Sequence, residues 1–127
     1  MRILGITALL IFCWLLYPAK SPANTYIGPV TASYYGPGLY GNHTACGLTL
    51  SPLTRGVAHR SLPCGARLTL RTWNGTRFRL VRTRVIDRGP FIPGRTFDLT
   101  LITARDLCQC KQPPGLTRLY YRRGWFY

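Results

Sequence analysis

The stretch "RVIDRGPFIPGRTFDLT", residues 84–100, carries a strand-like run into a loop rich in Gly and Pro. Asp87 ends the run "RTRVID" and enters the turn "RGP", where a side chain can emerge at a groove. It is one of three carboxylates in 127 residues, and it stands among Arg84, Arg88 and Arg95. An acid kept at this position is either a functional group or a structural residue that caps the turn or pairs with an arginine.

The chain is strongly basic and long enough for one domain. Seventeen Lys and Arg face three acids, which gives a net charge of +14, and fifteen of the cations are arginine. Arginine forms forked hydrogen bonds to phosphate and carboxylate groups. Composition therefore predicts an anion-rich partner, such as nucleic acid, an anionic membrane surface or an acidic cell-wall polymer.

Residues 1–23, "MRILGITALLIFCWLLYPAKSPA", have a cationic start, an apolar run and a stretch of small residues. We interpret them as a secretory signal peptide cleaved after Ala23, which leaves a domain over residues 24–127. The apolar run is about 15 residues, short of the ~20 that span a membrane, so a retained anchor is the alternative. A secreted, periplasmic or cell-envelope location follows, and it makes nucleic acid a poor physiological target.

Four cysteines lie beyond the leader, an even number that favours disulfides in a small exported domain. We expect Cys46 to pair with Cys64, because each lies in a Gly-containing turn and the loop between them is long enough to close. Cys108 and Cys110 are two positions apart, so their pairing stays open. A metal site is the alternative use of the four thiols, but the usual Cys-x-x-Cys spacing is absent.

The remaining sequence is typical of short strands separated by turns. The run "LTLRTWNGTRFRLV" predicts a β-hairpin around Asn74-Gly75. In its second half, arginines alternate with Phe78, Leu80, Val81 and Val85, which we expect to pack inward. The predicted strands cover residues 31–36, 56–60, 66–73, 77–87 and 116–123.

One segment, "LTLITARDLC", has helical character. Thr100 is a candidate N-cap, and Leu101, Ala104 and Leu107 fall on one side of the helix. Together these patterns predict an all-β fold, a small closed barrel with one short helix.

Three blocks, "ASYYGPGLYGNHTACG", "GVAHRSLPCGARL" and "VIDRGPFIPGRTFDLT", resemble in order and spacing the signature blocks of one bacterial family. This family is the rare-lipoprotein-A-type proteins, the septal-ring lytic transglycosylases, here in a disulfide-bearing branch. The resemblance implies a six-stranded double-psi β-barrel, related by fold to expansins and barwin-like proteins. It covers about Thr31 to Leu107, with "GLTRLYYRR" as the last strand.

The resemblance implies that peptidoglycan glycan strands are cleaved between N-acetylmuramic acid and N-acetylglucosamine to leave a 1,6-anhydro end. Hydrolases of the usual kind need two carboxyl groups. Here the 6-hydroxyl of the sugar attacks, so one side chain can act first as acid and then as base. Asp87 matches the central aspartate of the family and is the predicted catalytic residue.

Other site residues follow from the same blocks. His59 matches the barrel histidine and is the second predicted catalytic residue, which orients Asp87 or binds a sugar hydroxyl. The alternative is a histidine simply packed against backbone. Asp98 matches a second family aspartate, with capping or barrel bracing as the favoured role. The predicted substrate-binding residues are Tyr34, Tyr35, Tyr40, Arg88 and Asp98, although neighbouring Tyr34 and Tyr35 should face opposite ways.

Leu48 is the main departure, because many family members carry an acid shortly after the "TA-x-G" block. The alternative function is therefore a non-catalytic, expansin-like module that binds or loosens wall polysaccharide. The expected partners are peptidoglycan and anionic envelope polymers, with no physiological nucleic acid, metal or cofactor, and we expect a monomer. The arginine-rich faces are predicted to retain the protein on the envelope, with salt weakening the attraction.

Overall fold

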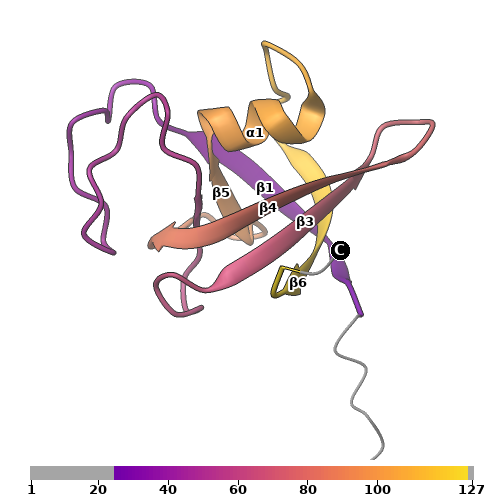
Figure 1. Cartoon of the computed structure of the whole chain (residues 1–127), viewed down its shortest axis with the longest axis horizontal. Helices are drawn as coiled ribbons and strands as arrows, with labels where there is room; N and C mark the ends of the chain where they lie inside the picture. Colours follow the sequence, from indigo (N-terminus) through magenta and orange to yellow (C-terminus); the bar gives the residue numbers. More distant parts are fainter. Residues whose placement is uncertain (1–24, 126–127) are drawn as a thin grey trace, which may run out of the picture.

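The computed structural model describes residues 25–125, and the predicted signal peptide, residues 1–23, lies outside that range. Six strands close into a barrel in the order β1-β5-β2-β4-β3-β6 (Figure 1). The all-β fold with one short helix is therefore confirmed. The elements are β1 (Ile27–Tyr35), β2 (Val57–Ala58), β3 (Arg67–Trp73), β4 (Phe78–Asp87), β5 (Phe97–Thr100), α1 (Leu101–Cys108) and β6 (Thr117–Arg123).

Two pairs of neighbouring strands are parallel, β1 with β5 and β2 with β4, and the other pairs are antiparallel. The parallel pairing sets Ala58 opposite Asp87, at the end of β4. Asp87 thus lies where two strands end side by side and their loops begin, a frequent position for functional side chains.

The hairpin predicted around Asn74-Gly75 is confirmed as the β3–β4 connection. Pairing runs from Arg67 with Arg84 to Trp73 with Phe78, and the Asn74 N–H donates to the Arg77 carbonyl at 3.1 Å. The tip is therefore Gly75-Thr76, one residue later than predicted. Gly75 has a φ of 97°, which favours glycine at this position.

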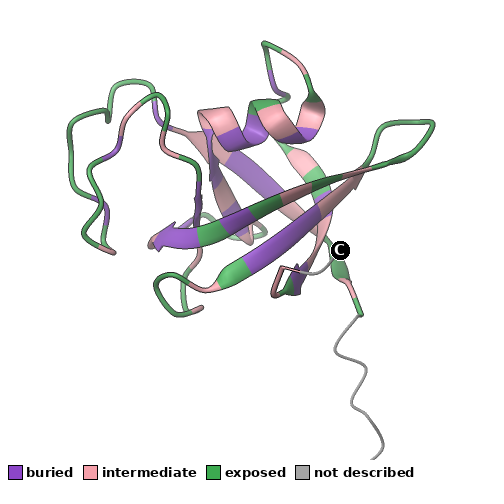
Figure 2. Cartoon of the chain, viewed as in Figure 1, coloured by how far each residue is buried: buried purple, intermediate pink, exposed green. Residues whose placement is uncertain are grey.

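The core lies inside the barrel and is closed on one side by α1 (Figure 2). Thr100 caps this helix as predicted, accepting a hydrogen bond from the Thr103 N–H. Ala104 and Leu107 join the core, and Gln109 ends the helix in the left-handed conformation. The core residues are Ala32, Val57, Leu68, Leu70, Val85, Phe97, Leu99, Ala104, Leu107 and Leu119.

The expectation that Phe78 and Leu80 face inward is wrong, because both side chains are exposed. Successive strand residues point to opposite faces, so Leu80 and Val81 cannot share one. Val81 pairs with Leu70 and packs against the core, which places Leu80 on the outer face. Strand β5 was also absent from the predicted segments.

Both disulfides are formed among the described cysteines. Cys46 and Cys64, with Cα atoms 5.6 Å apart, join the loop after β1 to the loop between β2 and β3, as predicted. Cys108 and Cys110 are bonded at the C-terminal end of α1. Each sulfur is thus bonded to another sulfur rather than present as a thiolate.

Between residues 25 and 125, no helix has the length and apolar character needed to cross a bilayer.

We predict that the two disulfides contribute unequally to stability, because the Cys46–Cys64 bond closes a loop with a sequence separation of 18 and the other closes one of 2. The Cys46→Ala/Cys64→Ala variant should lose about 3 kcal/mol of unfolding free energy, from the entropy of the opened loop. Urea unfolding under non-oxidising conditions measures this loss. The matched control, Cys108→Ala/Cys110→Ala, also removes two sulfurs and should lose clearly less; equal losses would contradict the assignment.

Candidate active site

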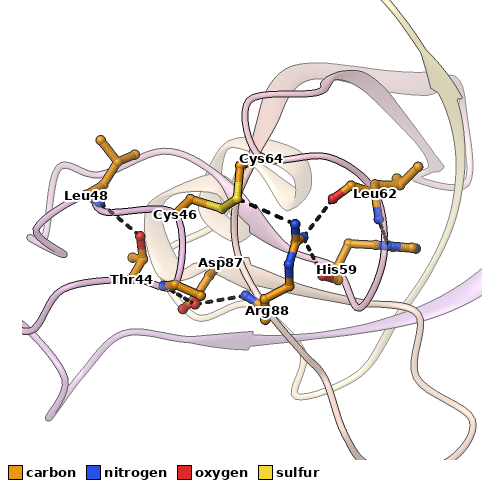
Figure 3. Close-up of a disulfide and its surroundings, with 9 residues drawn as sticks. Thr44, Cys46, Leu48, His59, Leu62, Cys64, Asp87 and Arg88 are labelled. Atoms are coloured by element: carbon orange, nitrogen blue, oxygen red, sulfur yellow. Dashed lines mark hydrogen bonds between the residues drawn. A yellow bond between two sulfur atoms is a disulfide. The ribbon is translucent and has the colours of Figure 1, made fainter.

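Asp87 is held in place by the backbone around it (Figure 3). Its Oδ1 accepts hydrogen bonds from the Ala45 N–H at 2.8 Å and from the Arg88 N–H at 2.9 Å. Ala45 precedes Cys46, whose N–H donates to the Ile86 carbonyl at 3.3 Å. The loop after β1 is therefore fastened beside Asp87 by backbone hydrogen bonds and by the Cys46–Cys64 bond.

The Arg88 guanidinium turns away from the Asp87 carboxylate. It donates to the carbonyl oxygens of His59 at 3.1 Å and Leu62 at 2.7 Å, with Cys64 Sγ at 3.5 Å. The structure therefore places Arg88, a predicted substrate-binding residue, as a brace of the loop between β2 and β3. The predicted alternative, an ion pair between Asp87 and an arginine, is therefore not formed. The arginine–carboxylate ion pair found within residues 25–125 joins Arg55 to Asp106.

Asp87 faces a small cavity of about 160 Å³. The cavity lies under the loop that follows β1, and that loop supplies most of its wall. The lining residues are Tyr35, Leu39, Asn42, His43, Thr44, Leu50 and Asp87. One carboxylate thus shares a cavity with a phenol, an imidazole, an amide and a hydroxyl group, which can together bind hydroxylated ligands.

Tyr35 is the last residue of β1, and its hydroxyl oxygen is buried. Burial, followed by the negative charge of nearby Asp87, raises the pKa of Tyr35 above its ordinary value, with Asp98 adding to the effect. The hydroxyl group approaches the Asp87 carboxylate, but no partner with ordinary hydrogen-bond distance and angle satisfies it among the described residues. Tyr35 is therefore a protonated donor that lies beside the Asp87 carboxylate.

Tyr34 and Tyr40 lie elsewhere. Tyr34 packs against the core, so the two adjacent tyrosines face opposite ways, as the strand pattern required. Tyr40 is exposed, and its ring lies against the backbone of Gly36. Neither of them lines the cavity that contains Asp87.

His59 serves the loop that carries Cys64. Its Nδ1 accepts the N–H groups of Ser61 at 3.1 Å and Leu62 at 3.0 Å, and its ring packs on Phe97 with centroids 5.1 Å apart. Burial, then the charges of Arg60 and Arg88, lower the pKa of His59. An Nδ1 that accepts hydrogen bonds leaves the ring proton on Nε2. The structure does not bring His59 into the cavity with Asp87.

Asp98 joins β5 to β1. The Ser33 Oγ donates to Asp98 Oδ1 across the parallel pair, in which Ser33 and Asp98 are register partners. This contact is the barrel-bracing arrangement that the sequence favoured. The influence of Asp98 on the site is electrostatic, because its negative charge contributes to the raised pKa of Tyr35.

Leu48 is exposed, and its side chain points away from Asp87 (Figure 3). Its N–H donates to Thr44 Oγ1 at 3.2 Å, which tightens the turn next to the cavity. Sequence reasoning missed Asn42, His43 and Thr44 as cavity residues, although they lie within the first quoted block. The signal that could have found them is their position next to the disulfide-bearing "TACG" turn, which Asn42 and His43 precede and Thr44 begins.

Together, the closed six-stranded barrel, the disulfide-tied loop and the strand-end aspartate define a small barrel domain with one carboxylate in its cavity. The curated proteins similar to this chain include the "probable endolytic peptidoglycan transglycosylase RlpA" of Synechocystis sp., 42% identical over 74 residues. The protein of the same name from Nostoc sp. is 45% identical over 78 residues. The "endolytic peptidoglycan transglycosylase RlpA" of Helicobacter pylori is 30% identical over 103 residues.

The resemblance to rare-lipoprotein-A-type proteins is thus confirmed for the barrel. These alignments cover 58%, 60% and 81% of this chain but 22%, 20% and 32% of the respective relatives. The chain therefore spans about a fifth to a third of the length of these curated relatives. No protein-family model matches the chain.

We predict that His59 makes stability depend on pH. Because the folded state lowers its pKa from 6.5, protonation favours the unfolded chain. Its stabilising contribution is therefore complete above about pH 6.5 and is lost as the pH falls through the lower, folded value. Urea midpoints measured between pH 7.5 and 5.5 should fall with pH in the unaltered protein, where few carboxylates titrate.

The His59→Gln variant removes this titration and keeps an acceptor oxygen, so the pH dependence of its midpoint should shrink. His43→Gln, which alters the other histidine, should leave the dependence in place. Equal slopes for the two variants would show that His59 is not the titrating group.

Proposed function

We propose that the chain is a lytic transglycosylase that cleaves peptidoglycan glycan strands between N-acetylmuramic acid and N-acetylglucosamine. The observation that carries the proposal is the position of the Asp87 carboxylate, fixed at a cavity by backbone N–H groups while Arg88 is engaged elsewhere. The names of the similar curated proteins, endolytic peptidoglycan transglycosylases, support it.

The reaction can proceed with one carboxyl group. Protonated Asp87 donates its proton to the glycosidic oxygen, the C1–O4 bond breaks, and N-acetylglucosamine leaves with a free 4-hydroxyl. The 6-hydroxyl of N-acetylmuramic acid attacks C1, and the carboxylate accepts the proton that the hydroxyl loses. The proton count closes, Asp87 is regenerated protonated, and no water is consumed.

The hydrogen bonds of Asp87 suit this use. Both backbone donors bind Oδ1, which leaves Oδ2 to exchange the proton with the glycan. The rigid attachment fixes the carboxyl group before substrate arrives, and preorganisation of this kind lowers the cost of reaching the reactive geometry. The Cys46–Cys64 bond, Arg88 and His59 act as positioning elements, because they hold the two loops that flank the carboxyl group.

The cavity admits only part of a glycan. At about 160 Å³ it can hold part of one sugar ring, so the strand must lie along the surface with a single group entering beside Asp87. Tyr35 is placed to donate a hydrogen bond to that group, because its buried hydroxyl is protonated and lies beside the Asp87 carboxylate. Asn42 and Thr44 line the same cavity and supply further polar groups.

A second candidate function is a non-catalytic, expansin-like module that binds or loosens wall polysaccharide. Leu48 favours it, since an exposed leucine stands where many family members carry an acid. The other two carboxylates do not replace that acid, because Asp98 is bound to Ser33 and Asp106 is paired with Arg55.

The proposed location is the cell envelope, where the glycan strands are found. Two disulfides fit an oxidising compartment outside the cytosol. Anionic envelope polymers are proposed as additional partners of this basic chain, with association weakened by salt.

We predict that Asp87→Asn lowers the rate of anhydro-muramyl product formation by roughly 100-fold or more, because an amide cannot transfer the proton. The assay incubates purified protein with denuded glycan strands and quantifies products by mass spectrometry. Binding is followed in parallel by pelleting with sacculi, which the variant should retain.

The matched control is Asp106→Asn, which makes the same change at a surface ion pair and should keep the activity of the unaltered protein. Products that persist in Asp87→Asn would refute Asp87 as the acid and base. Pelleting without products in the unaltered protein would favour the binding module.

We predict that Tyr35→Phe lowers kcat about tenfold, the effect of one lost hydrogen bond, and changes KM less than about twofold. Steady-state kinetics on denuded glycan separates the two parameters. Tyr34→Phe is the control, since that ring packs against the core, and it should leave kcat near the original value. An unchanged kcat in Tyr35→Phe, or an equal fall in both variants, would contradict the role of the Tyr35 hydroxyl.

A further inference from the structure

The barrel has a second distinctive surface on the outer side of β4, β3 and β6, which we call the outer face. Leu70 and Val81 pair toward the core, so the neighbouring pairs, Arg71 with Leu80 and Trp73 with Phe78, point outward. The β3–β6 register continues this face. Its outward positions are Arg67, Arg71, Trp73, Phe78, Leu80, Arg82, Arg84, Arg118 and Tyr120. Thr69 and Arg122 have the same orientation but are buried.

The outer face bears positive charge without a side-chain carboxylate. None of the outward positions is acidic: Asp87 lies at the cavity and Asp98 is bonded to Ser33. Asp106, on α1, is paired with Arg55 and borders the face in a pocket that it shares with Leu80 and Arg82. Charge complementarity therefore requires an anionic partner.

Aromatic rings hold several of these arginines flat. The Arg71 guanidinium carbon lies 4.0 Å from the centroid of Tyr26 and 4.1 Å from that of Phe78. Arg67 and Arg84 lie 4.6 and 4.7 Å from the ring of Trp125. Arg67 and Arg84 are exposed, and a guanidinium that lies against a ring can still bind phosphate oxygens through its N–H edges. The Nε of Arg71 is buried, so Arg71 contributes mainly its charge. The stacked rings are, by the same contacts, less open to the faces of sugars.

The far end of the face is apolar. Trp73, Phe78 and Leu80 are 55%, 44% and 59% exposed. They lie toward the tip of the β3–β4 hairpin, which extends beyond the body of the barrel (Figures 1 and 2). Large apolar side chains that gather at an exposed projection mark an interaction surface. A soluble polyanion would satisfy the arginines but would leave these three side chains in water.

We propose that the outer face docks on an anionic phospholipid bilayer. The exposed arginines of the face, such as Arg67 and Arg84, bind lipid phosphates. Trp73, Phe78 and Leu80 enter the boundary between headgroups and acyl chains. A bilayer surface offers both partners, negative charge and an apolar layer directly beneath it. Tryptophan is favoured at this boundary, because its ring is largely apolar and its N–H can still bond to headgroups or water.

The test uses residues 25–127, because the apolar leader would itself bind lipid. Every strand and every core residue lies between Ile27 and Arg123, so this part contains the complete barrel. Partition is measured by sedimentation with vesicles of phosphatidylglycerol and phosphatidylcholine, about one to two. Trp73→Ala/Leu80→Ala should weaken partition about tenfold or more.

The matched control is Leu53→Ala/Phe91→Ala, which also removes one leucine and one aromatic ring. These residues are 76% and 79% exposed and lie off the outer face, so partition should change less than about twofold. Thermal unfolding checks that each variant is folded. If the Trp73→Ala/Leu80→Ala variant is not folded, the single variant Leu80→Ser replaces it, because position 80 is exposed. Leu80→Ser should weaken partition severalfold.

Partition of the unaltered protein should fall when phosphatidylcholine replaces phosphatidylglycerol and when salt is raised. Four outcomes would overturn the proposal: no partition to the anionic vesicles, full partition by the folded tip variant, equal losses in the control, or insensitivity to lipid charge. Soluble polyphosphate is the last probe. Binding to it that matches binding to vesicles, and that the tip variant retains, would show that the face recognises a polyanion instead of a bilayer.

Discussion

The hydrogen bond from the Ala45 N–H to Asp87 Oδ1 links the two parts of the site. Asp87 belongs to a barrel strand, whereas Ala45 belongs to a long loop whose only pairing of its own, among the described residues, is an isolated bridge between His43 and Thr49 and a few turn hydrogen bonds. That loop would lose much of its order without attachment, since fixing each residue carries an entropic cost. The Cys46–Cys64 bond at the next residue limits the freedom of the loop in the unfolded chain and keeps Ala45 near the end of β4.

The same constraint explains why the basic residues near the carboxylate do not neutralise it. Arg88 is adjacent in sequence, but its side chain follows the loop between β2 and β3, where the carbonyls of His59 and Leu62 take its N–H groups. His59 in turn accepts two N–H groups from that loop. Arg88 and His59 are thus bound to backbone groups of this loop. The carboxyl group of Asp87 is left facing the cavity beside Tyr35. Some of the other arginines lie on the outer face, whereas Arg60 binds the carbonyls of Pro90 and Arg95 in the loop that follows Asp87.

The parts predicted correctly from the sequence have local or covalent signals. The hairpin follows from Asn74-Gly75, the helix from Thr100 and its apolar spacing, and the Cys46–Cys64 bond from two turn cysteines. Strand β5 has no such signal, because its four residues depend on pairing with β1, as Ser33 does with Asp98 across 65 positions. The hydrogen bonds of His59 and Arg88 could not be predicted from the sequence, because their backbone partners come together only in the folded chain. Phe78 and Leu80 were misassigned because hydrophobic character alone does not say which face of a strand is buried.

The central claim is that a glycan strand crosses the barrel with its scissile bond at Asp87. The most direct measurement is a crystal structure of the Asp87→Asn protein with a tetrasaccharide of alternating N-acetylglucosamine and N-acetylmuramic acid. The account predicts a glycosidic oxygen within about 3.2 Å of the side chain at position 87, with the Tyr35 hydroxyl bonded to the same sugar. A saccharide bound away from this cavity, with position 87 untouched, would contradict it.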